Sequence, residues 1–157
     1  MTTATTDPTF PSSTHYVFLE DGGATASLEL NDAFYQGLRG GPPTSPGMQR
    51  FMSGNGWLIT ATDLEAEVSR WETHTTGDEL LILISGAIDL VTEDANGQTR
   101  IVELRPGRAF IVPKGTWHRF ITREPSKFIG VAYGQAGKGT IYRPIAAREA
   151  SEPAAVP

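Results

Sequence analysis

Four residues in two short segments carry side chains suited to hold a metal ion: Glu72, His74, Glu79 and His118. The first segment, residues 71–86, reads WETHTTGDELLILISG, and the second, residues 107–118, reads GRAFIVPKGTWH. The chain of 157 residues contains three histidines, and two of them lie in these segments. Imidazole and carboxylate donors together suit divalent Fe, Mn, Ni, Co or Zn. We therefore expect a divalent metal site.

The strands expected around these residues indicate how the four side chains meet. Glu72 and His74 share one face of a predicted strand at residues 68–75, because successive side chains of a strand point to opposite faces. A loop then reverses the chain, so that Glu79 opens the next strand and faces the pair across a hairpin. His118 starts a later strand and supplies the fourth donor if that strand lines the same barrel.

Short strands occupy most of the chain from residue 48 onward. They are predicted at residues 48–53, 56–62, 68–75, 79–85, 87–93, 98–104, 108–112, 117–122, 126–133 and 140–143. Asn96-Gly97 predicts a type I′ turn between two of them, and Ser85-Gly86 predicts a further tight turn. Closely spaced strands without intervening helices favour an antiparallel sandwich or barrel.

The remaining elements lie at the two ends of the chain. The predicted organisation is a disordered segment at residues 1–14, a strand, short helix and loop at 15–47, a barrel at 48–145 and a flexible tail at 146–157. Asn31 is a suitable N-cap for a helix at 31–38. The glycine- and proline-rich loop at 41–47 is expected to rim a site. The apolar run at 16–19 is predicted to be an edge strand through which two copies pair.

Composition excludes several classes of protein and of site. The chain carries 13 Lys and Arg against 18 Asp and Glu, a formal charge of −5, which argues against nucleic acid or an anionic membrane as partner. Because there is no cysteine, disulfides and thiolate-held metals are excluded. The polar start of the chain does not resemble a secretory signal, and no apolar run reaches the roughly 18 residues of a membrane span. A cytoplasmic protein is the expectation.

The first segment resembles the first sequence box of the cupin superfamily. That box has the order His-x-His, three or four residues, Glu, six residues, Gly. Here Glu72-x-His74 is followed by four residues, Glu79, six residues and Gly86.

The second segment resembles the second cupin box, in which Gly, five residues, Pro-x-Gly, two residues, His, three residues and Asn follow one another. The chain has Gly107, Pro113-Lys-Gly115, His118 and Thr122 at these spacings. The resemblance covers roughly residues 50 to 135.

Three positions depart from the family pattern: Glu72 replaces the first His, Thr122 the closing Asn and Ala66 an early Gly. Only the exchange at Glu72 changes the donor set of the metal. Three interpretations stay open: Glu72 is a ligand, a general base beside a three-ligand metal, or a polar residue in a pocket that has lost its metal.

The resemblance implies an all-β double-stranded β-helix, the jelly-roll barrel of cupins, preceded by a short helix. It implies a homodimer and a small metalloenzyme of dioxygenase, isomerase or cyclase type that acts on a compact oxygenated molecule. The alternative is a metal-free cupin that binds or senses a small ligand without catalysis. Arg119, next to His118, is a candidate contact for an anionic substrate. The alternative, which is commoner for arginines, is an exposed side chain with no role in the site.

Overall fold

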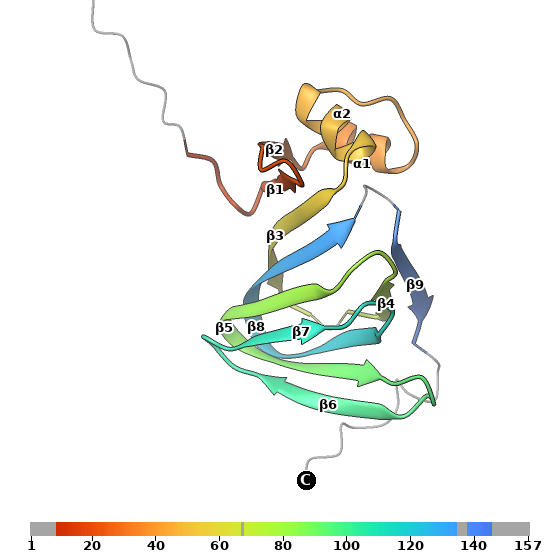
Figure 1. Cartoon of the computed structure of the whole chain (residues 1–157). Coiled ribbons are helices and arrows are strands. Elements are labelled where there is room, and N and C mark those ends of the chain that lie inside the picture. Colours follow the sequence, from red (N-terminus) through yellow and green to blue (C-terminus); the bar gives the residue numbers. More distant parts are fainter. Residues whose placement is uncertain (1–8, 67, 135–137, 146–157) are drawn as a thin grey trace, which may run out of the picture.

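The computed structural model describes residues 9–66, 68–134 and 138–145, which form nine strands and two short helices (Figure 1). The strands are β1 (His15–Glu20), β2 (Thr25–Glu29), β3 (Gly56–Leu64), β4 (Arg70–His74), β5 (Glu79–Glu93), β6 (Thr99–Leu104), β7 (Ala109–Val112), β8 (Trp117–Gly134) and β9 (Thr140–Pro144). The helices are α1 (Asp32–Leu38) and α2 (Pro46–Ser53). The predicted segments 1–14 and 146–157 fall wholly or partly outside the described residues, at 1–8 and 146–157.

The strands form an antiparallel jelly-roll barrel, as the sequence predicted (Figure 1). The sheet runs in the order β2-β1-β3-β8-β4-β9, and β5 pairs with β6, β7 and β8. Strand β8 is the common partner of β3, β4 and β5. This shared strand connects the two sides of the barrel and brings donors from distant parts of the chain together.

Two pairs of predicted strands are single long strands in the structure. Strand β5 continues through Ser85-Gly86, where a tight turn was predicted, and its pairing with β8 shifts register around these residues. Gly86 has a φ of 85°, and an added Cβ there would clash with Ser126 Oγ and the Pro125 carbonyl oxygen. A glycine at such an irregularity bends a strand without ending it. The predicted turn at Ser85-Gly86 is therefore wrong.

The hairpin between β5 and β6 is present, but its turn is not of type I′. Gly97 has a φ of 77°, whereas Asn96 does not have a positive φ. The Gly97 N–H donates to the Asp94 carbonyl oxygen at 3.0 Å, and Asp94 Oδ1 accepts from the N–H groups of Asn96 and Gln98. A three-residue connection with Gly in the left-handed position fits this pattern better, because it needs only one residue of positive φ.

A helix replaces the strand that was predicted at residues 48–53. Helix α2 begins after Ser45, whose Oγ accepts a hydrogen bond from the Met48 N–H at 3.1 Å, and Pro46 occupies its first turn. Ser at the N-cap followed by Pro is a strong helix start. Met48 and Phe51 lie three residues apart and are both buried. The predicted helix at 31–38 is confirmed, with Asn31 as its N-cap.

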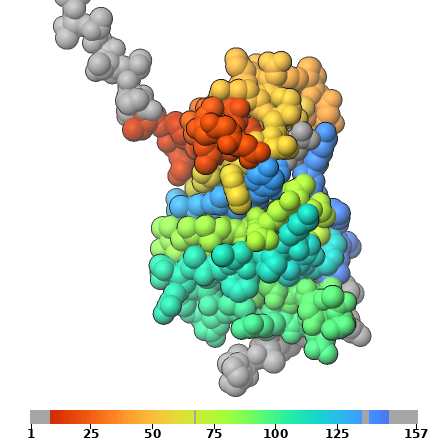
Figure 2. Space-filling model, viewed as in Figure 1, coloured from red at the N-terminus to blue at the C-terminus, as the bar shows by residue number. Residues whose placement is uncertain are grey.

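The N-terminal elements form a second core at one end of the barrel. Its buried residues are Phe18, Leu28, Phe34, Met48 and Phe51. Strand β1 pairs with β2 on one side and β3 on the other, so the run at 16–19 is not an edge strand. The expectation was wrong because β2 was not predicted. Figure 2 shows these red to orange elements seated over the green and blue strands.

A larger apolar core fills the barrel itself. Its buried members are Leu64, Leu81, Leu83, Ile88, Leu90, Leu104, Val112, Phe120 and Phe128. Within the described part of the chain, neither helix has the length and apolar character needed to cross a membrane.

Candidate metal centre

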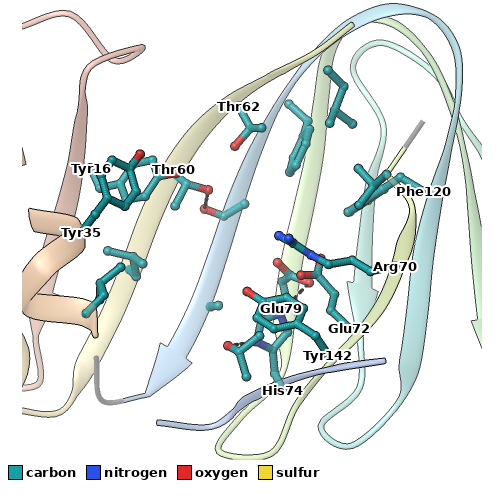
Figure 3. Close-up of a pocket in the computed structure, with 18 of the residues that line it drawn as sticks. Tyr16, Tyr35, Thr60, Thr62, Arg70, Glu72, His74, Glu79, Phe120 and Tyr142 are labelled. Carbon is teal, nitrogen blue, oxygen red and sulfur yellow. Dashed lines mark hydrogen bonds and ion pairs between the residues drawn. The ribbon is translucent and has the colours of Figure 1, made fainter. Parts of the chain in front are cut away.

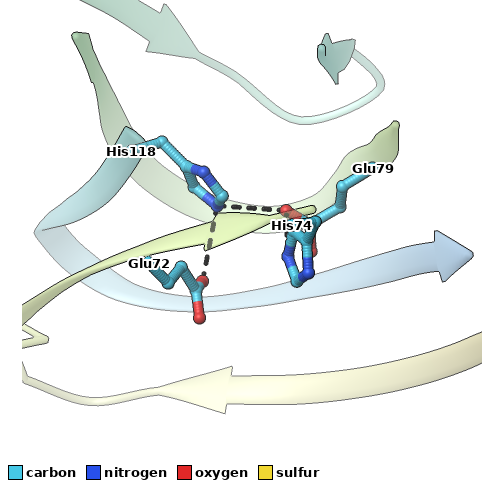
Figure 4. Close-up of side chains that lie close together, drawn as sticks. All are labelled: Glu72, His74, Glu79 and His118. Atoms are coloured by element: carbon cyan, nitrogen blue, oxygen red, sulfur yellow. Dashed lines mark ion pairs between the residues drawn. The ribbon is translucent and has the colours of Figure 1, made fainter. Parts of the chain in front are cut away.

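Glu72, His74, Glu79 and His118 converge inside the barrel (Figure 4). One donor atom of each lies within 4.8 Å of the donor atoms of the other three. Glu79 Oε2 lies 3.0 Å from His118 Nε2 and 3.2 Å from His74 Nε2. Glu72 Oε1 lies 3.4 Å from His118 Nε2. The structure thus brings the four predicted residues together.

These separations match the edges of a coordination sphere. With metal–ligand bonds of about 2.1 Å, neighbouring ligand atoms lie roughly 3.0 Å apart in an octahedron and roughly 3.4 Å apart in a tetrahedron. Three contacts, at 3.0, 3.2 and 3.4 Å, fall in this interval, and all four donor atoms lie within 4.8 Å of one another, so the group is compact enough to surround a single ion.

Strand β4 presents two donors because its side chains alternate. Glu72 and His74 face the cavity, while Trp71 and Thr73 are buried on the opposite side, 1% and 3% exposed. The Trp71 ring packs against the guanidinium of Arg143, whose Cζ lies 4.9 Å from the ring centroid. Trp71 and Thr73 thus lie on the face of β4 that is turned away from the cavity, which is the arrangement that alternation along the strand predicts.

Glu79 reaches the site from a different strand than the sequence suggested. The predicted hairpin between the strands of His74 and Glu79 is wrong, because β4 pairs with β8 and β9, whereas β5 pairs with β6, β7 and β8. Glu79 lies opposite Ala132 of β8 and Val112 of β7. It therefore contacts His74 across the barrel interior.

Each histidine is held through Nδ1, which leaves Nε2 for the site. His118 Nδ1 lies 3.3 Å from the Thr116 carbonyl oxygen, and because a carbonyl only accepts, Nδ1 carries the hydrogen. In the neutral imidazole, Nε2 then has the free electron pair. His74 Nδ1 lies 3.1 Å from the hydroxyl of Thr140, its register partner on β9.

The turn before His118 is tied to the end of β4. The Gly115 N–H donates to the His74 carbonyl oxygen at 2.7 Å, and the Lys114 N–H donates to Asp78 Oδ1 at 2.8 Å. Asp78 is therefore a loop residue that positions the turn, and it does not belong to the metal-binding group. These bonds place the His118 backbone opposite Glu72, with which it pairs in register.

Two of the donors have shifted pKa values in the metal-free protein. Burial lowers the pKa of His118, but its polar contacts with Glu72 and Glu79 outweigh burial and raise the pKa to about 9. Burial raises the pKa of Glu79, but the contacts with His118 and His74 outweigh it and lower the pKa to about 2. At neutral pH Glu79 and His118 thus form a buried ion pair.

The donor atoms lie close together without well-aligned hydrogen bonds between them. His74 Nε2, Glu79 Oε2 and His118 Nε2 are buried, and none has a well-aligned hydrogen bond within the described residues. Their contacts of 3.0 and 3.2 Å are short enough for ion pairs but poorly directed for hydrogen bonds. Buried polar atoms rarely stay unpartnered. A divalent ion satisfies all three at once, so the residues fit a metal.

A cavity of about 660 Å³ leads from this group to the N-terminal elements (Figure 3). Glu72, His74 and Glu79 line it, whereas His118 lies beneath its surface and is fully buried. Helix α1 contributes to the other end of the lining. Of the described lining residues, none comes from the loop at 41–47, which was expected to rim the site.

The sequence analysis did not single out the polar residues that line the cavity beside the four donors. Arg70, Thr140 and Tyr142 line the cavity, and Arg70 Cζ lies 4.3 Å from the centroid of the Tyr142 ring. Arg119, which the sequence offered as a candidate contact against the commoner exposed arginine, is not among the described lining residues, and its Cζ lies 5.4 Å from the centroid of the Trp71 ring. The available signal was alternation, since Arg70 shares a strand face with Glu72 and His74.

Comparison with known proteins places the barrel among related structures. Residues 62–131 match the family model of the cupin domain. A cupin-2 domain containing protein from Shewanella frigidimarina is 22% identical, with 48% of this chain and 69% of that chain covered and a TM-score of 0.42. No curated protein matches the sequence.

Two further solved structures are similar to part of this chain at lower sequence identity. Peruvianin-I, a cysteine peptidase from Thevetia peruviana latex, is 18% identical, with 57% of each chain covered and a TM-score of 0.50. A variant of oxalate decarboxylase from Bacillus subtilis is 17% identical, with 57% of this chain and 24% of that chain covered and a TM-score of 0.49. The chain thus spans about half or less of these two relatives, and the likeness concerns the fold alone.

Proposed function

Because residues 62–131 match the family model of the cupin domain, we propose that this chain is a small metalloenzyme that holds one divalent ion in the barrel and acts on an oxygenated small molecule. The reaction is of dioxygenase, isomerase or cyclase type. The proposed ligands are Glu72, His74, Glu79 and His118.

One observation carries this proposal: four donor atoms from three strands meet within 4.8 Å, and three of them are buried without a well-aligned hydrogen bond. Packing alone does not account for such a group, because burying polar atoms without partners costs free energy. Two carboxylates and two neutral imidazoles carry two negative charges, which balance a divalent ion. Such a set favours harder ions, such as Mn and Fe(II), more than three histidines would.

Glu72 is the most exposed of the four proposed ligands. Its side chain is 20% exposed, against 12% for His74, 10% for Glu79 and none for His118. A bound divalent ion supplies a Lewis acid that polarises a carbonyl or hydroxyl oxygen. Glu72 lines the cavity beside it, and we propose that this carboxylate also accepts a proton from the substrate.

The proposal is tested by elemental analysis of tag-free protein purified alongside three variants. His118→Asn and Glu72→Gln remove a proposed ligand, whereas His15→Asn changes the one histidine outside the group. We expect near-stoichiometric transition metal in the parent and in His15→Asn, and reduced metal in the other two. Dioxygen uptake of the loaded parent then separates an oxygenase from an isomerase or cyclase.

Two results would change the assignment. Loss of metal in His118→Asn but not in Glu72→Gln would make Glu72 a general base beside a three-ligand ion. Absence of metal from the parent, even after reconstitution with Mn and Fe(II), would overturn the metalloenzyme.

A metal-free binding protein is the second candidate, and the buried ion pair supports it. Glu79 and His118 compensate each other's charge at 3.0 Å without an ion. In that case the polar residues of the cavity bind a ligand directly, and calorimetry with metal-depleted protein detects it.

We also propose that the protein is a homodimer. Among the described residues, β2 and β9 end the sheet order and each pairs with one neighbouring strand, so the other edge of each is a candidate for pairing between copies. Light scattering at two concentrations measures the mass, and a mass of one chain at both would contradict this proposal.

A further inference from the structure

The cavity has one cationic side chain beside the metal-binding group. Among its described lining residues, Arg70 is the only arginine or lysine. It lies two residues before Glu72 and four before His74 on β4, so all three share a strand face. With a divalent ion balanced by two carboxylates, Arg70 gives this end of the cavity a net positive charge.

Arg70 is oriented by stacking and keeps its donors available. Its guanidinium carbon lies 4.3 Å from the centroid of the Tyr142 ring, which engages one face of the planar group. Stacking leaves the in-plane N–H groups free, and those match the two oxygens of a carboxylate. No described carboxylate forms an ion pair with Arg70.

The wall that leads away from Arg70 is mostly apolar, with Thr60 and Thr62 among its polar members. Apolar lining residues of the barrel are Leu58, Leu64, Val68, Phe120 and Phe128, and the N-terminal elements contribute Tyr16, Phe34, Tyr35, Leu38 and Phe51. Figure 3 shows Arg70 and Tyr142 beside Glu72 and Glu79, with Tyr16 and Tyr35 at the opposite end.

The size of the cavity adds a requirement on the ligand. Its volume of about 660 Å³ lies within the usual range for pockets that enclose drug-sized molecules. A compact acid would occupy the polar end and leave apolar wall in contact with water. Tyr35 and Leu38 of α1 are 43% and 38% exposed, so the wall has apolar surface that a longer ligand can cover.

We propose that the substrate is an elongated amphipathic carboxylic acid. Arg70 binds its carboxylate beside the metal-binding group, and its apolar body extends along the barrel wall toward Tyr35 and Leu38. This inference deepens the proposed function and rests on it for the metal that faces the carboxylate end.

Binding of defined probes to the metal-loaded protein tests the inference. Calorimetry compares butanoate, octanoate and dodecanoate, with octanamide as the uncharged analogue of octanoate. Affinity is expected to rise roughly fourfold for each methylene that becomes buried, and octanamide is expected to bind roughly 10- to 100-fold more weakly than octanoate.

Matched variants assign these effects to the two ends of the cavity, near Arg70 and near Leu38. Arg70→Gln is expected to weaken the binding of octanoate roughly 10- to 100-fold and to leave the affinity for octanamide unchanged. Arg100→Gln, on the distant strand β6, is expected to change neither affinity. Leu38→Ser is expected to weaken the binding of dodecanoate but not that of butanoate. Ile101→Ser on β6 is the control for this change.

Metal content of every variant separates this inference from the proposed function. Retained metal with lost carboxylate preference in Arg70→Gln supports both. Binding that depends on Arg70 in a protein without metal supports the proposal of an amphipathic acid as ligand and overturns the proposal of a metalloenzyme. Equal binding of octanoate and octanamide, or an unchanged affinity in Arg70→Gln, would overturn the amphipathic acid whatever the metal content.

Discussion

In the metal-free protein, replacing Glu79 by Gln should flatten the pH dependence of stability. Glu79 Oε2 is the nearest acceptor to His118 Nε2, at 3.0 Å, and Glu72 Oε1 follows at 3.4 Å. The Gln side chain keeps the size of Glu79 and removes its charge. The buried imidazolium of His118 then has one anionic neighbour in place of two.

The magnitude follows from the pKa of His118, which folding raises from 6.5 to about 9. A group whose pKa is raised in the folded state adds stability that is complete below its unfolded pKa and is lost as the pH rises through its folded pKa. At about 1.4 kcal/mol per pKa unit, the unfolding free energy of the parent should fall by roughly 3 kcal/mol between pH 6 and pH 9.5. Glu79→Gln should lose roughly half as much, because Glu72 remains.

Urea unfolding with a chelator present at both pH values measures these changes. Glu65→Gln is the control, since it makes the same chemical change at an exposed residue. If the unfolding free energies of the parent and Glu79→Gln change with pH in parallel, Glu79 does not hold the proton on His118, which contradicts this prediction.

Three further predictions concern the metal and the fold. Metal binding at pH 7 should release a proton from His118 and tighten as the pH rises toward 9, which calorimetry in buffers of different ionisation enthalpy detects. Gly86→Ala should lower the unfolding free energy by more than 2 kcal/mol because its Cβ meets Ser126, whereas Gly97→Ala, in open space, should cost only about 1–2 kcal/mol of backbone strain. Phe51→Ala should lower the unfolding free energy by about 3–5 kcal/mol, as measured by urea unfolding, because the Phe51 side chain is only 4% exposed in the N-terminal core.

The convergence of Glu72, His74, Glu79 and His118 was predictable because its evidence is local. Glu72 and His74 share a strand face through simple alternation, and the turn at 113–115 fixes the start of the strand that carries His118. The four donors therefore needed only a barrel to bring them together. The sequence does not distinguish the three interpretations of Glu72, because its role depends on distances between strands that are far apart in the chain.

The errors concern pairing and competition between local signals. The strands β5 and β8 continue through glycine and proline, because pairing along their whole length outweighs the local preference for a turn. Helix α2 was missed because Ser45-Pro46 indicates a helix start as well as a loop. Arg70 was missed because its cavity depends on β9 and α1, whose positions no local pattern specifies.

The most direct test of the metal centre is anomalous scattering from a crystal of the protein reconstituted with Mn. We expect one strong peak inside the barrel, about 2.0–2.3 Å from His74 Nε2, His118 Nε2, Glu79 Oε2 and Glu72 Oε1. A barrel without a peak, or a peak held only by other residues, would contradict it.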